Sequence, residues 1–350
     1  MTFVRNFALL AGALLLLATG LHRHQAVAQT AVPQPEEAAK AWWNEYFAGA
    51  RLVRLPDGHA LNLYCRGKGS PIVVLEGGLG DAAWAWRGLQ AAIARDTKVC
   101  VYDRAGYWNS PAVAGARDAS TEADDLANLL RAAHLPAPYL LVGHSYGAYI
   151  IRLFASRHPD RLAGLVLVDP SSPYQTLRLT QALPRFADPI AQFQAAENAK
   201  YKACAQPSAP ASSCILQPAF PDIPPERLAW FQTAQGPGLA STMLRETEAM
   251  KGISAAQVES ERIRLGAIPF VLLTRGNRFS ELPGASEEET VVASALWRRM
   301  HREILDLSTN SEMRVVEGAG HSIQTDKPQA VIAAIADVLA KARAGAPQSR

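Results

Sequence analysis

The segment from Gly143 to Gly147 constrains the fold more than any other part of this 350-residue chain. It reads Gly-His-Ser-Tyr-Gly, with Ser145 at its centre. An apolar run typical of a strand, residues 138–142, precedes it, and an amphipathic stretch typical of a helix, residues 148–155, follows it. Glycines on both sides of a serine allow a sharp turn between strand and helix, which exposes the serine oxygen at the tip. We therefore predict a strand–turn–helix unit in which Ser145 is a candidate nucleophile rather than a structural turn serine.

Short apolar runs alternate with helical patterns along most of the chain. The runs typical of strands are residues 51–55, 60–65, 71–75, 97–102, 139–142, 165–168, 268–274 and 313–316. Helical patterns such as residues 84–93 and 121–133 lie between them. This alternation favours an α/β fold with a mostly parallel sheet and helices on both faces. Residues 172–266 lack clean strand signals, and we expect them to form a mostly helical cap inserted at the carboxyl edge of the sheet.

The first 28 residues have the character of a signal peptide. Arg5 gives a basic start, residues 7–17 form an apolar run, and Ala26-Val27-Ala28 offers a small-residue cleavage site. The run is too short to span a bilayer comfortably, so we expect secretion or periplasmic export with cleavage after Ala28, in preference to a retained anchor. The net charge of +3 falls to +1 when Arg5 and Arg23 leave with the leader. Such a balance gives no case for a nucleic acid or an anionic surface as a partner.

Four cysteines suit an oxidising compartment: Cys65, Cys100, Cys204 and Cys214. None has Cys-x-x-Cys spacing, so we expect neither a metal site nor a thioredoxin-like site. Cys204 and Cys214 bracket a stretch rich in Ala, Pro and Ser, and a disulfide closing this loop is the simple prediction.

An aromatic stripe follows the leader, in the predicted helix 36–48. It consists of Trp42, Trp43, Tyr46 and Phe47, and we expect it to pack on the body of the protein rather than on a membrane surface. The predicted organisation is a signal peptide (1–28), an N-terminal helical segment (29–50), a core in two parts (51–171 and 267–343) around the cap (172–266), and a disordered tail (344–350).

Four further motifs accompany the serine segment. They are Val74-Leu75-Glu76-Gly77-Gly78-Leu79-Gly80, Tyr102-Asp103-Arg104-Ala105-Gly106, Leu165-Val166-Leu167-Val168-Asp169-Pro170 and Gly318-Ala319-Gly320-His321. In this order the chain resembles the α/β-hydrolase superfamily, specifically its secreted bacterial esterase-like members. The resemblance covers nearly the whole chain after the leader, with the cap least informative. It implies an eight-stranded sheet with the second strand beside the fourth, and therefore a disulfide between Cys65 and Cys100 on neighbouring strands.

The resemblance also implies a partner for Ser145. A serine hydroxyl is a weak nucleophile until a base takes its proton and an acid orients that base. His321 matches the family's histidine and follows a predicted strand, so we take it as the base. His144 is the rival by adjacency, but neighbouring side chains at a sharp turn point in different directions, and we expect it to be structural.

The acid departs from the family's commonest pattern. That position lies after the seventh strand, where residues 275–279 contain no carboxylate. Asp169 closes the sixth predicted strand and resembles the alternative acid position of some lipases of this fold. Glu281 is the next candidate, followed by a dyad without an acid, and Asp169 could instead only cap a turn.

Stabilisation of a tetrahedral oxyanion requires donors aimed at it. The backbone N–H of Tyr146, the residue after the nucleophile, is one expected donor. The glycine-rich loop after the third strand should supply the other, from Leu79 or, as second choice, from Gly78. We expect Asp103 and Arg104 to form a buried ion pair that braces the site.

These residues predict a serine hydrolase that cleaves a small carboxylic ester through a Ser-His-Asp triad and an acyl-enzyme. An aminopeptidase or amidase of proline-iminopeptidase type is the near alternative. A dehalogenase or an epoxide hydrolase would have Asp in place of Ser145. A binding protein that kept the fold but lost turnover is the alternative of a different class, supported by the carboxylate missing after the seventh strand. No cofactor is implied, and the sequence is silent on the oligomeric state.

Overall fold

One eight-stranded sheet forms the centre of the region that the computed structural model describes, residues 35–210, 214–216, 220–262, 264–277, 279, 282 and 284–345. The strands are β1 (Arg51–Arg54), β2 (Ala60–Arg66), β3 (Ile72–Glu76), β4 (Val99–Asp103), β5 (Tyr139–His144), β6 (Leu162–Val168), β7 (Phe270–Arg275) and β8 (Ser311–Val316). Their order is β1-β2-β4-β3-β5-β6-β7-β8. Only the pairings of β2 with β1 and β4 are antiparallel. The predicted placement of the second strand beside the fourth is confirmed.

The described helices are α1 (Pro35–Gly49), α2 (Gln90–Ile93), α3 (Ala119–Ala132), α4 (Gly147–Arg157), α5 (Gln175–Ala182), α6 (Ala187–Cys204), α7 (Leu228–Thr233), α8 (Pro237–Lys251), α9 (Ile253–Ser260), α10 (Glu287–Leu305), α11 (Ile323–Asp326) and α12 (Pro328–Gly345). Short 3₁₀ turns are η1 (Ala83–Trp86), η2 (Pro159–Arg161), η3 (Pro184–Phe186) and η5 (Pro225–Arg227). The predicted helix 84–93 is thus split into η1 and α2. None of the described helices is long and apolar enough to cross a membrane.

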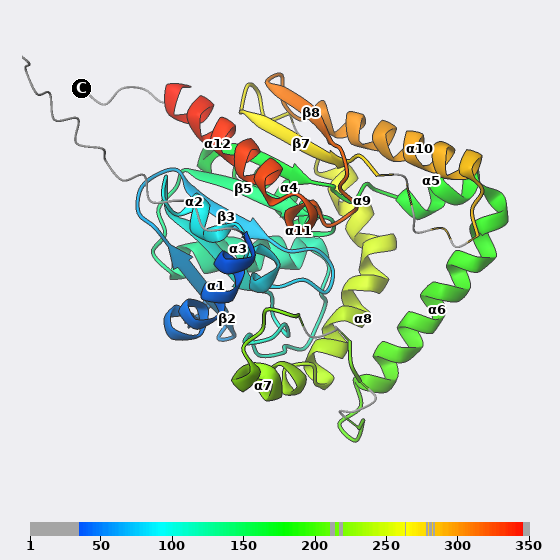
Figure 1. Ribbon diagram of the computed structural model, residues 1–350, viewed down its shortest axis with the longest axis horizontal. Coiled ribbons are helices and arrows are strands. Elements are labelled where there is room, and N and C mark those ends of the chain that lie inside the picture. Colours follow the sequence, from blue (N-terminus) through cyan, green and yellow to red (C-terminus); the bar gives the residue numbers. More distant parts are fainter. Residues whose placement is uncertain are drawn as a thin grey trace, which may run out of the picture. The chain divides into compact units, whose positions relative to one another are not determined.

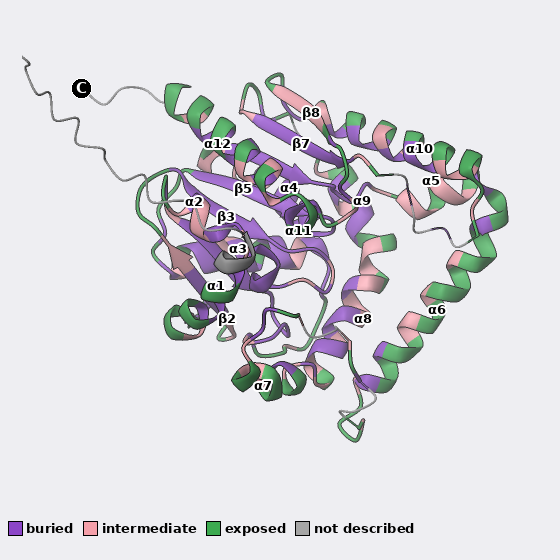
Figure 2. Cartoon of the chain, viewed as in Figure 1, coloured by how far each residue is buried: buried purple, intermediate pink, exposed green. Residues whose placement is uncertain are grey.

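The central strands are buried on both faces because successive side chains enter two different cores. In β5, Leu140 and Val142 join the core formed with α1, α2 and α12. Tyr139 and Leu141 join the core formed with α3 and α4 on the other face. Figure 2 shows these strands as buried between outer helices whose outward surfaces are exposed. The predicted α/β architecture with helices on both faces is confirmed.

Helix α1 packs on the body of the protein through its aromatic stripe. Trp42 and Trp43 are fully buried, and their indole N–H groups donate to Gln90 and Asp222. The Tyr46 hydroxyl donates to the buried carboxylate of Asp103 at 2.7 Å. The stripe is therefore part of the core rather than an exposed surface.

The described residues between β6 and β7 form helices, turns and loops and contain no strand. Figure 1 shows α5 to α9 following one another through this region, where α6 packs on α8. Helix α9 packs on α3 and α4, so the cap rests directly on the helices of the core.

The structure bonds Cys65 to Cys100 and Cys204 to Cys214, the two pairs that the sequence predicts. Cys65 and Cys100 are register partners on β2 and β4. The predicted signal peptide, 1–28, lies outside the described residues, as do 346–350 of the predicted tail. Helix α12 continues to Gly345, two residues past the predicted end of the core.

Candidate active site

Ser145 lies in the sharp turn between β5 and α4, as the sequence predicts. Its φ of +49° is in the left-handed region, which costs a non-glycine residue about 1–2 kcal/mol. A Cβ on Gly147 would lie only 2.4 Å from the backbone oxygen of Gly77. Because Gly147 has no side chain, the loop after β3 lies directly against the turn, with Gly78 beside the Ser145 side chain.

The three residues predicted to act together lie in one hydrogen-bonded row. His321, in the loop between β8 and α11, accepts from the Ser145 hydroxyl at Nε2 over 2.9 Å. Its Nδ1 donates to Asp169 Oδ2 over 2.6 Å. Asp169 directly follows β6, whereas β5 and β8 lead into the other two residues, so three carboxyl strand ends converge on one point. Of the His321 side chain, 34% is exposed, which leaves its ring accessible to a substrate.

Asp169 is fully buried and accepts hydrogen bonds at both oxygens. The backbone N–H and the Nε of Arg275 donate to it at 3.0 and 2.8 Å, and the indole of Trp297 donates at 3.0 Å. Burial would raise the pKa of Asp169, but the His321 hydrogen bond and the Arg275 charge hold it well below its ordinary range. Where the family's commonest pattern has the acid, β7 thus ends in the cation Arg275, which pairs with Asp169 at the end of β6. The alternative acid, Glu281, lies outside the described residues.

His301, on α10, lies behind this row. Its Nε2 donates to the backbone oxygen of Pro170 at 2.9 Å, and its Nδ1 accepts from the Thr274 hydroxyl at 2.8 Å. Burial lowers the pKa of His301 to about 4, so the ring is neutral at neutral pH. His301 thus anchors the turn that carries Asp169, a role that the sequence does not reveal.

Neither the Tyr146 N–H nor the Leu79 N–H has an acceptor among the described residues. Both were predicted as oxyanion donors. The second choice, Gly78, already donates its N–H to the Asp81 carboxylate at 3.2 Å. The arrangement leaves Tyr146 and Leu79 as the pair of donors open to a ligand.

Arg104 fixes the loop that carries these donors. Its guanidinium donates to the backbone oxygens of Gly77 and Gly78, both at 2.9 Å. A trans peptide points its N–H away from its C=O. Because Arg104 holds the Gly78 carbonyl, it also sets the direction of the Leu79 N–H, which belongs to the same peptide unit.

Two carboxylates hold Arg104 in place. Glu76 accepts at 2.8 Å, and Glu246, on the cap helix α8, accepts at 3.0 and 2.9 Å. Burial raises the pKa of Glu76 to about 6, against the lowering effect of Arg104. The Tyr107 hydroxyl also donates to Glu246 and accepts from the Gly80 N–H. Glu246 on α8 is therefore linked to the loop indirectly, through Arg104 and Tyr107.

The predicted ion pair between Asp103 and Arg104 is wrong. Asp103 instead accepts from Tyr46, from Asn62 and from the Ala83 N–H. Successive side chains at the end of a strand point to opposite sides, so these neighbours enter different networks.

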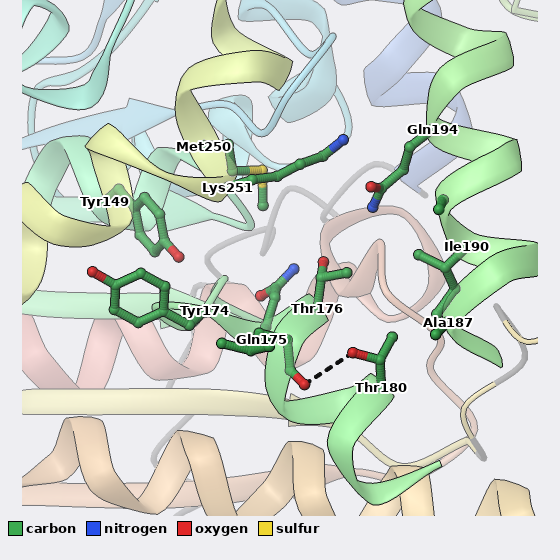
Figure 3. A pocket seen from close by; sticks show the side chains of 12 residues that line it. Tyr149, Tyr174, Gln175, Thr176, Thr180, Ala187, Ile190, Gln194, Met250 and Lys251 are labelled. Carbon is green, nitrogen blue, oxygen red and sulfur yellow. Dashed lines mark hydrogen bonds between the residues drawn. The ribbon is translucent and has the colours of Figure 1, made fainter. Parts of the chain in front are cut away.

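Two cavities adjoin the site region. One, of about 330 Å³, lies between α4, α5, α6 and α8, and Figure 3 shows Tyr149, Tyr174 and Gln175 on its wall. The other, of about 160 Å³, is mainly apolar and is lined by Leu179, Ile190, Phe193, Phe279, Leu282, Trp297 and Met300, among others. Trp297 joins the second cavity to Asp169, because the same indole that lines it donates to that carboxylate.

The described residues contain one group that brings cation ligands together, Asp57, His59 and Asp125. His59 bonds Asp57 at 2.7 Å, and Arg117 donates to Asp125 at 2.7 Å. Both carboxylates thus already have a partner, and none of the three residues belongs to the Ser145 site.

The chain is similar to known proteins over most of its length. Residues 72–334 match the model of the alpha/beta hydrolase family. The uncharacterized protein YqjL of Bacillus subtilis is 29% identical over 283 residues, which cover 81% of this chain and 89% of that protein. A pimeloyl-[acyl-carrier protein] methyl ester esterase of Chromobacterium violaceum is 38% identical over 116 residues, covering 32% of this chain and 42% of that enzyme.

Solved structures show the same fold. A thermophilic esterase from Thermogutta terrifontis superposes with a TM-score of 0.57 at 20% identity, covering 84% of this chain and 98% of that one. The epoxide hydrolase CorEH superposes with a TM-score of 0.52 at 19% identity, covering 83% and 98%. At such identities the likeness extends to the fold alone.

Proposed function

This chain belongs to the alpha/beta hydrolase family, and from that premise we propose that it is a serine hydrolase that cleaves carboxylic esters through an acyl-enzyme. The observation that carries the proposal is the hydrogen-bonded row from Ser145 through His321 to Asp169, at 2.9 and 2.6 Å. A nucleophile, a base within reach of it and a carboxylate orienting the base are the parts that acyl transfer needs.

In the proposed first half-reaction, Ser145 Oγ bonds to the ester carbonyl carbon while its proton passes to His321 Nε2. Asp169 holds the ring in the tautomer that accepts this proton, and its charge stabilises the imidazolium that forms. The oxyanion accepts hydrogen bonds from the backbone N–H groups of Tyr146 and Leu79. The bond to the alcohol then breaks, and His321 returns the proton to the leaving alkoxide.

In the second half-reaction, water replaces the alcohol. His321 takes a proton from the water as the hydroxide attacks the acyl carbon, and the carbonyl re-forms as Ser145 Oγ leaves with that proton. The products are a carboxylic acid and the free serine. The chemistry requires no cofactor.

We propose the apolar cavity beside Trp297 as the site for an apolar group of the ester. Its volume of about 160 Å³ suits a short chain rather than a large ring system. Esters of rising acyl length, assayed beside aminoacyl amides, test this point. A peak of kcat/KM at short to medium acyl length supports it, whereas a preference for the amides favours the aminopeptidase alternative.

A fluorophosphonate probe tests the proposed chemistry directly. We expect the wild-type protein to be labelled at Ser145 and to hydrolyse p-nitrophenyl esters, and the Ser145→Ala variant to do neither. A folded wild-type protein that neither reacts with the probe nor hydrolyses any ester contradicts the proposal and favours the silent binding protein.

We also propose that the protein is exported. The leader character of residues 1–28 and the two disulfides support this, because disulfides persist in oxidising compartments. N-terminal sequencing of the protein recovered outside the cytoplasm should begin at Gln29. A cytoplasmic protein that still begins at Met1 contradicts this proposal.

A further inference from the structure

His144 is the last residue of β5 and immediately precedes Ser145, but its ring takes no part in the row described above. The side chain is 4% exposed, and both ring nitrogens face oxygen acceptors. Nδ1 lies 2.9 Å from Asp81 Oδ2, and Nε2 lies 3.1 Å from the backbone oxygen of His321.

The number of hydrogens on the ring follows from these two contacts. A neutral imidazole has one N–H donor and one acceptor nitrogen, whereas an imidazolium has two donors. The His321 carbonyl can only accept. Asp81 also accepts, since the same Oδ2 receives the Gly78 N–H at 3.2 Å. Burial would raise the pKa of Asp81, but the bonds from His144 and Gly78 hold it below its ordinary value.

His301 provides the contrast. One of its nitrogens also faces a carbonyl oxygen, but the other faces the hydroxyl of Thr274, which can donate. A neutral ring therefore satisfies both contacts of His301. At His144 a neutral ring would place a nitrogen lone pair against an oxygen acceptor in either tautomer, against the Asp81 carboxylate in one and against the His321 carbonyl in the other.

We propose that His144 carries a hydrogen on both ring nitrogens and thereby positions the His321 loop and disfavours protonation of His321, and is thus a positioning residue for the reaction proposed above. It completes a chain that runs from the Gly78 N–H through Asp81 and His144 to the His321 carbonyl. This chain ties the loop of the oxyanion donors to the loop of the base. The inference rests on the proposed function for its effect on rate, but not for the charge on the ring.

The charge acts on His321 at short range. The centroids of the two rings are 4.7 Å apart. Desolvation lowers the pKa of His321, the hydrogen bond to Asp169 raises it, and the charge of His144 lowers it again, with a net lowering.

Other charges also face this pair. Arg275 of β7 lowers the pKa of His321 further, and the neutral His301 lies behind Asp169. Arg104 acts on Asp81, whose carboxylate partly offsets the His144 charge. The charge of His144 lowers the pKa of His321 more than that of Arg275 does, so its removal should have a visible effect on the titration of His321.

Two variants of His144 separate charge from position. His144→Gln removes the charge but keeps an amide donor at the place of Nε2, toward the His321 carbonyl. His144→Asn keeps a donor at the place of Nδ1, toward Asp81, and loses the His321 contact. Both should move the acid limb of kcat/KM upward by about one pH unit. His144→Asn alone should also lower kcat, by about tenfold.

Asp81→Asn is the intermediate case, because an amide can donate to Nδ1 and so allows a neutral His144. This variant removes the positive charge of His144 and the more distant negative charge of Asp81 together. The acid limb of kcat/KM should therefore move upward in pH, but by less than in the His144 variants. His134→Asn is the control: His134 is exposed, and its φ of +54° is one that Asn tolerates. An acid limb that stays at the wild-type position in folded His144→Gln and His144→Asn overturns the proposal.

A measurement on the wild-type protein tests the proposal even if the His144 variants fail to fold. In ¹⁵N-histidine-labelled protein, both His144 ring nitrogens should resonate as protonated at neutral pH, since each faces an acceptor. Asp81→Asn should move one of them to the unprotonated range, which assigns the signal. A wild-type His144 with an unprotonated nitrogen under this condition overturns the proposal. Because this reading needs no turnover, it stands even if the protein hydrolyses no ester.

Discussion

Two aspartate–histidine pairs lie next to Ser145, and they share one geometry but differ in what the second ring nitrogen meets. In one, Asp169 lies 2.6 Å from His321 Nδ1, and Nε2 faces the serine hydroxyl. In the other, Asp81 lies 2.9 Å from His144 Nδ1, and Nε2 faces a carbonyl oxygen. A hydroxyl can give up a proton to the ring, whereas a carbonyl can only accept one. The first pair is therefore suited to act as a base, whereas the second faces only acceptors, which is the basis for the proposed charge on His144.

The carboxylates differ as well. Asp169 is fully buried, with donors from Arg275, Trp297 and His321, whereas 18% of the Asp81 side chain is exposed. The charge of Arg275 keeps Asp169 ionised beside a histidine that must lose and regain a proton. Asp81 instead shares one oxygen between His144 and the Gly78 N–H. Only the first pair includes the ring that bonds Ser145, whereas the second meets the His321 loop at its backbone, so the two pairs are separable by mutation.

The largest expected difference is in kcat, between the variants Asp169→Asn and Asp81→Asn. An amide at position 169 stabilises the wrong tautomer of His321, so kcat should fall about ten-thousand-fold. An amide at position 81 keeps one of the two hydrogen bonds of Asp81 Oδ2 and leaves the Asp169–His321 pair intact, so kcat should fall by less than about tenfold. The measurement is kcat on a p-nitrophenyl ester, with circular dichroism to verify folding. Equal losses would remove the distinction between the pairs, and a normal kcat in Asp169→Asn would exclude Asp169 from the triad.

A smaller fall in kcat is expected when Arg104, which bonds the Gly77 and Gly78 carbonyls, is replaced. Arg104→Lys keeps the positive charge but cannot bind two carboxylates and two carbonyl oxygens in one plane. The Leu79 N–H then loses its fixed direction, and kcat should fall about a hundredfold with KM little changed.

Arg117→Lys is the control for this variant, since Arg117 is also buried and paired with carboxylates but does not bond the Gly77–Gly78 carbonyls. A loss in KM instead of kcat, or the same loss in Arg117→Lys, would show that Arg104 acts through general stability.

The sequence predicted the Ser145–His321–Asp169 row because the local context of each member agreed with the family resemblance, which singled out His321 and Asp169. Ser145 lies between flanking glycines, His321 follows a strand and a glycine pair, and Asp169 ends a buried strand. All three lie at carboxyl strand ends, which a parallel sheet brings to one edge. The carboxylate missing from residues 275–279 left the acid open in the sequence, and in the structure Arg275, the last residue of β7, pairs with Asp169.

The supporting networks could not be predicted in this way. Asp81 and His144 are 63 positions apart, and Arg104 and Glu246 are 142 apart. Their meeting depends on side-chain directions and on where the cap helix α8 packs. No local pattern encodes either, and the one contact inferred from adjacency, between Asp103 and Arg104, was wrong.

A stability experiment tests whether His301 is neutral in the folded protein. The ordinary pKa of 6.5 applies to His301 when unfolded, and burial lowers it to about 4 in the folded protein. Between these values the unfolded chain binds more protons, so stability falls as the pH falls. His301 should account for about 2 kcal/mol of the free energy of unfolding that is lost between about pH 6.5 and about pH 5.

Urea unfolding of wild type and His301→Asn over this range measures that contribution. The variant should be less stable at neutral pH but should lose less on acidification, with His134→Asn following the wild type. Parallel curves for wild type and His301→Asn would contradict a neutral, buried His301.

The smallest expected effect concerns the indole that connects the apolar cavity to the acid. Trp297→Phe keeps a ring in the wall of the cavity but removes one N–H donor from Asp169 Oδ1, which retains the Arg275 backbone N–H. The loss of one of several donors should cost about 1 kcal/mol, or about fivefold in kcat. Trp230→Phe is the control, because that indole donates to Asn109 instead. A fall in kcat that is the same for esters of every acyl length places the role of Trp297 in orienting Asp169. A fall that grows with acyl length would instead place Trp297 in substrate binding, and the Asp169–His321 pair would then depend on fewer neighbours than its geometry indicates.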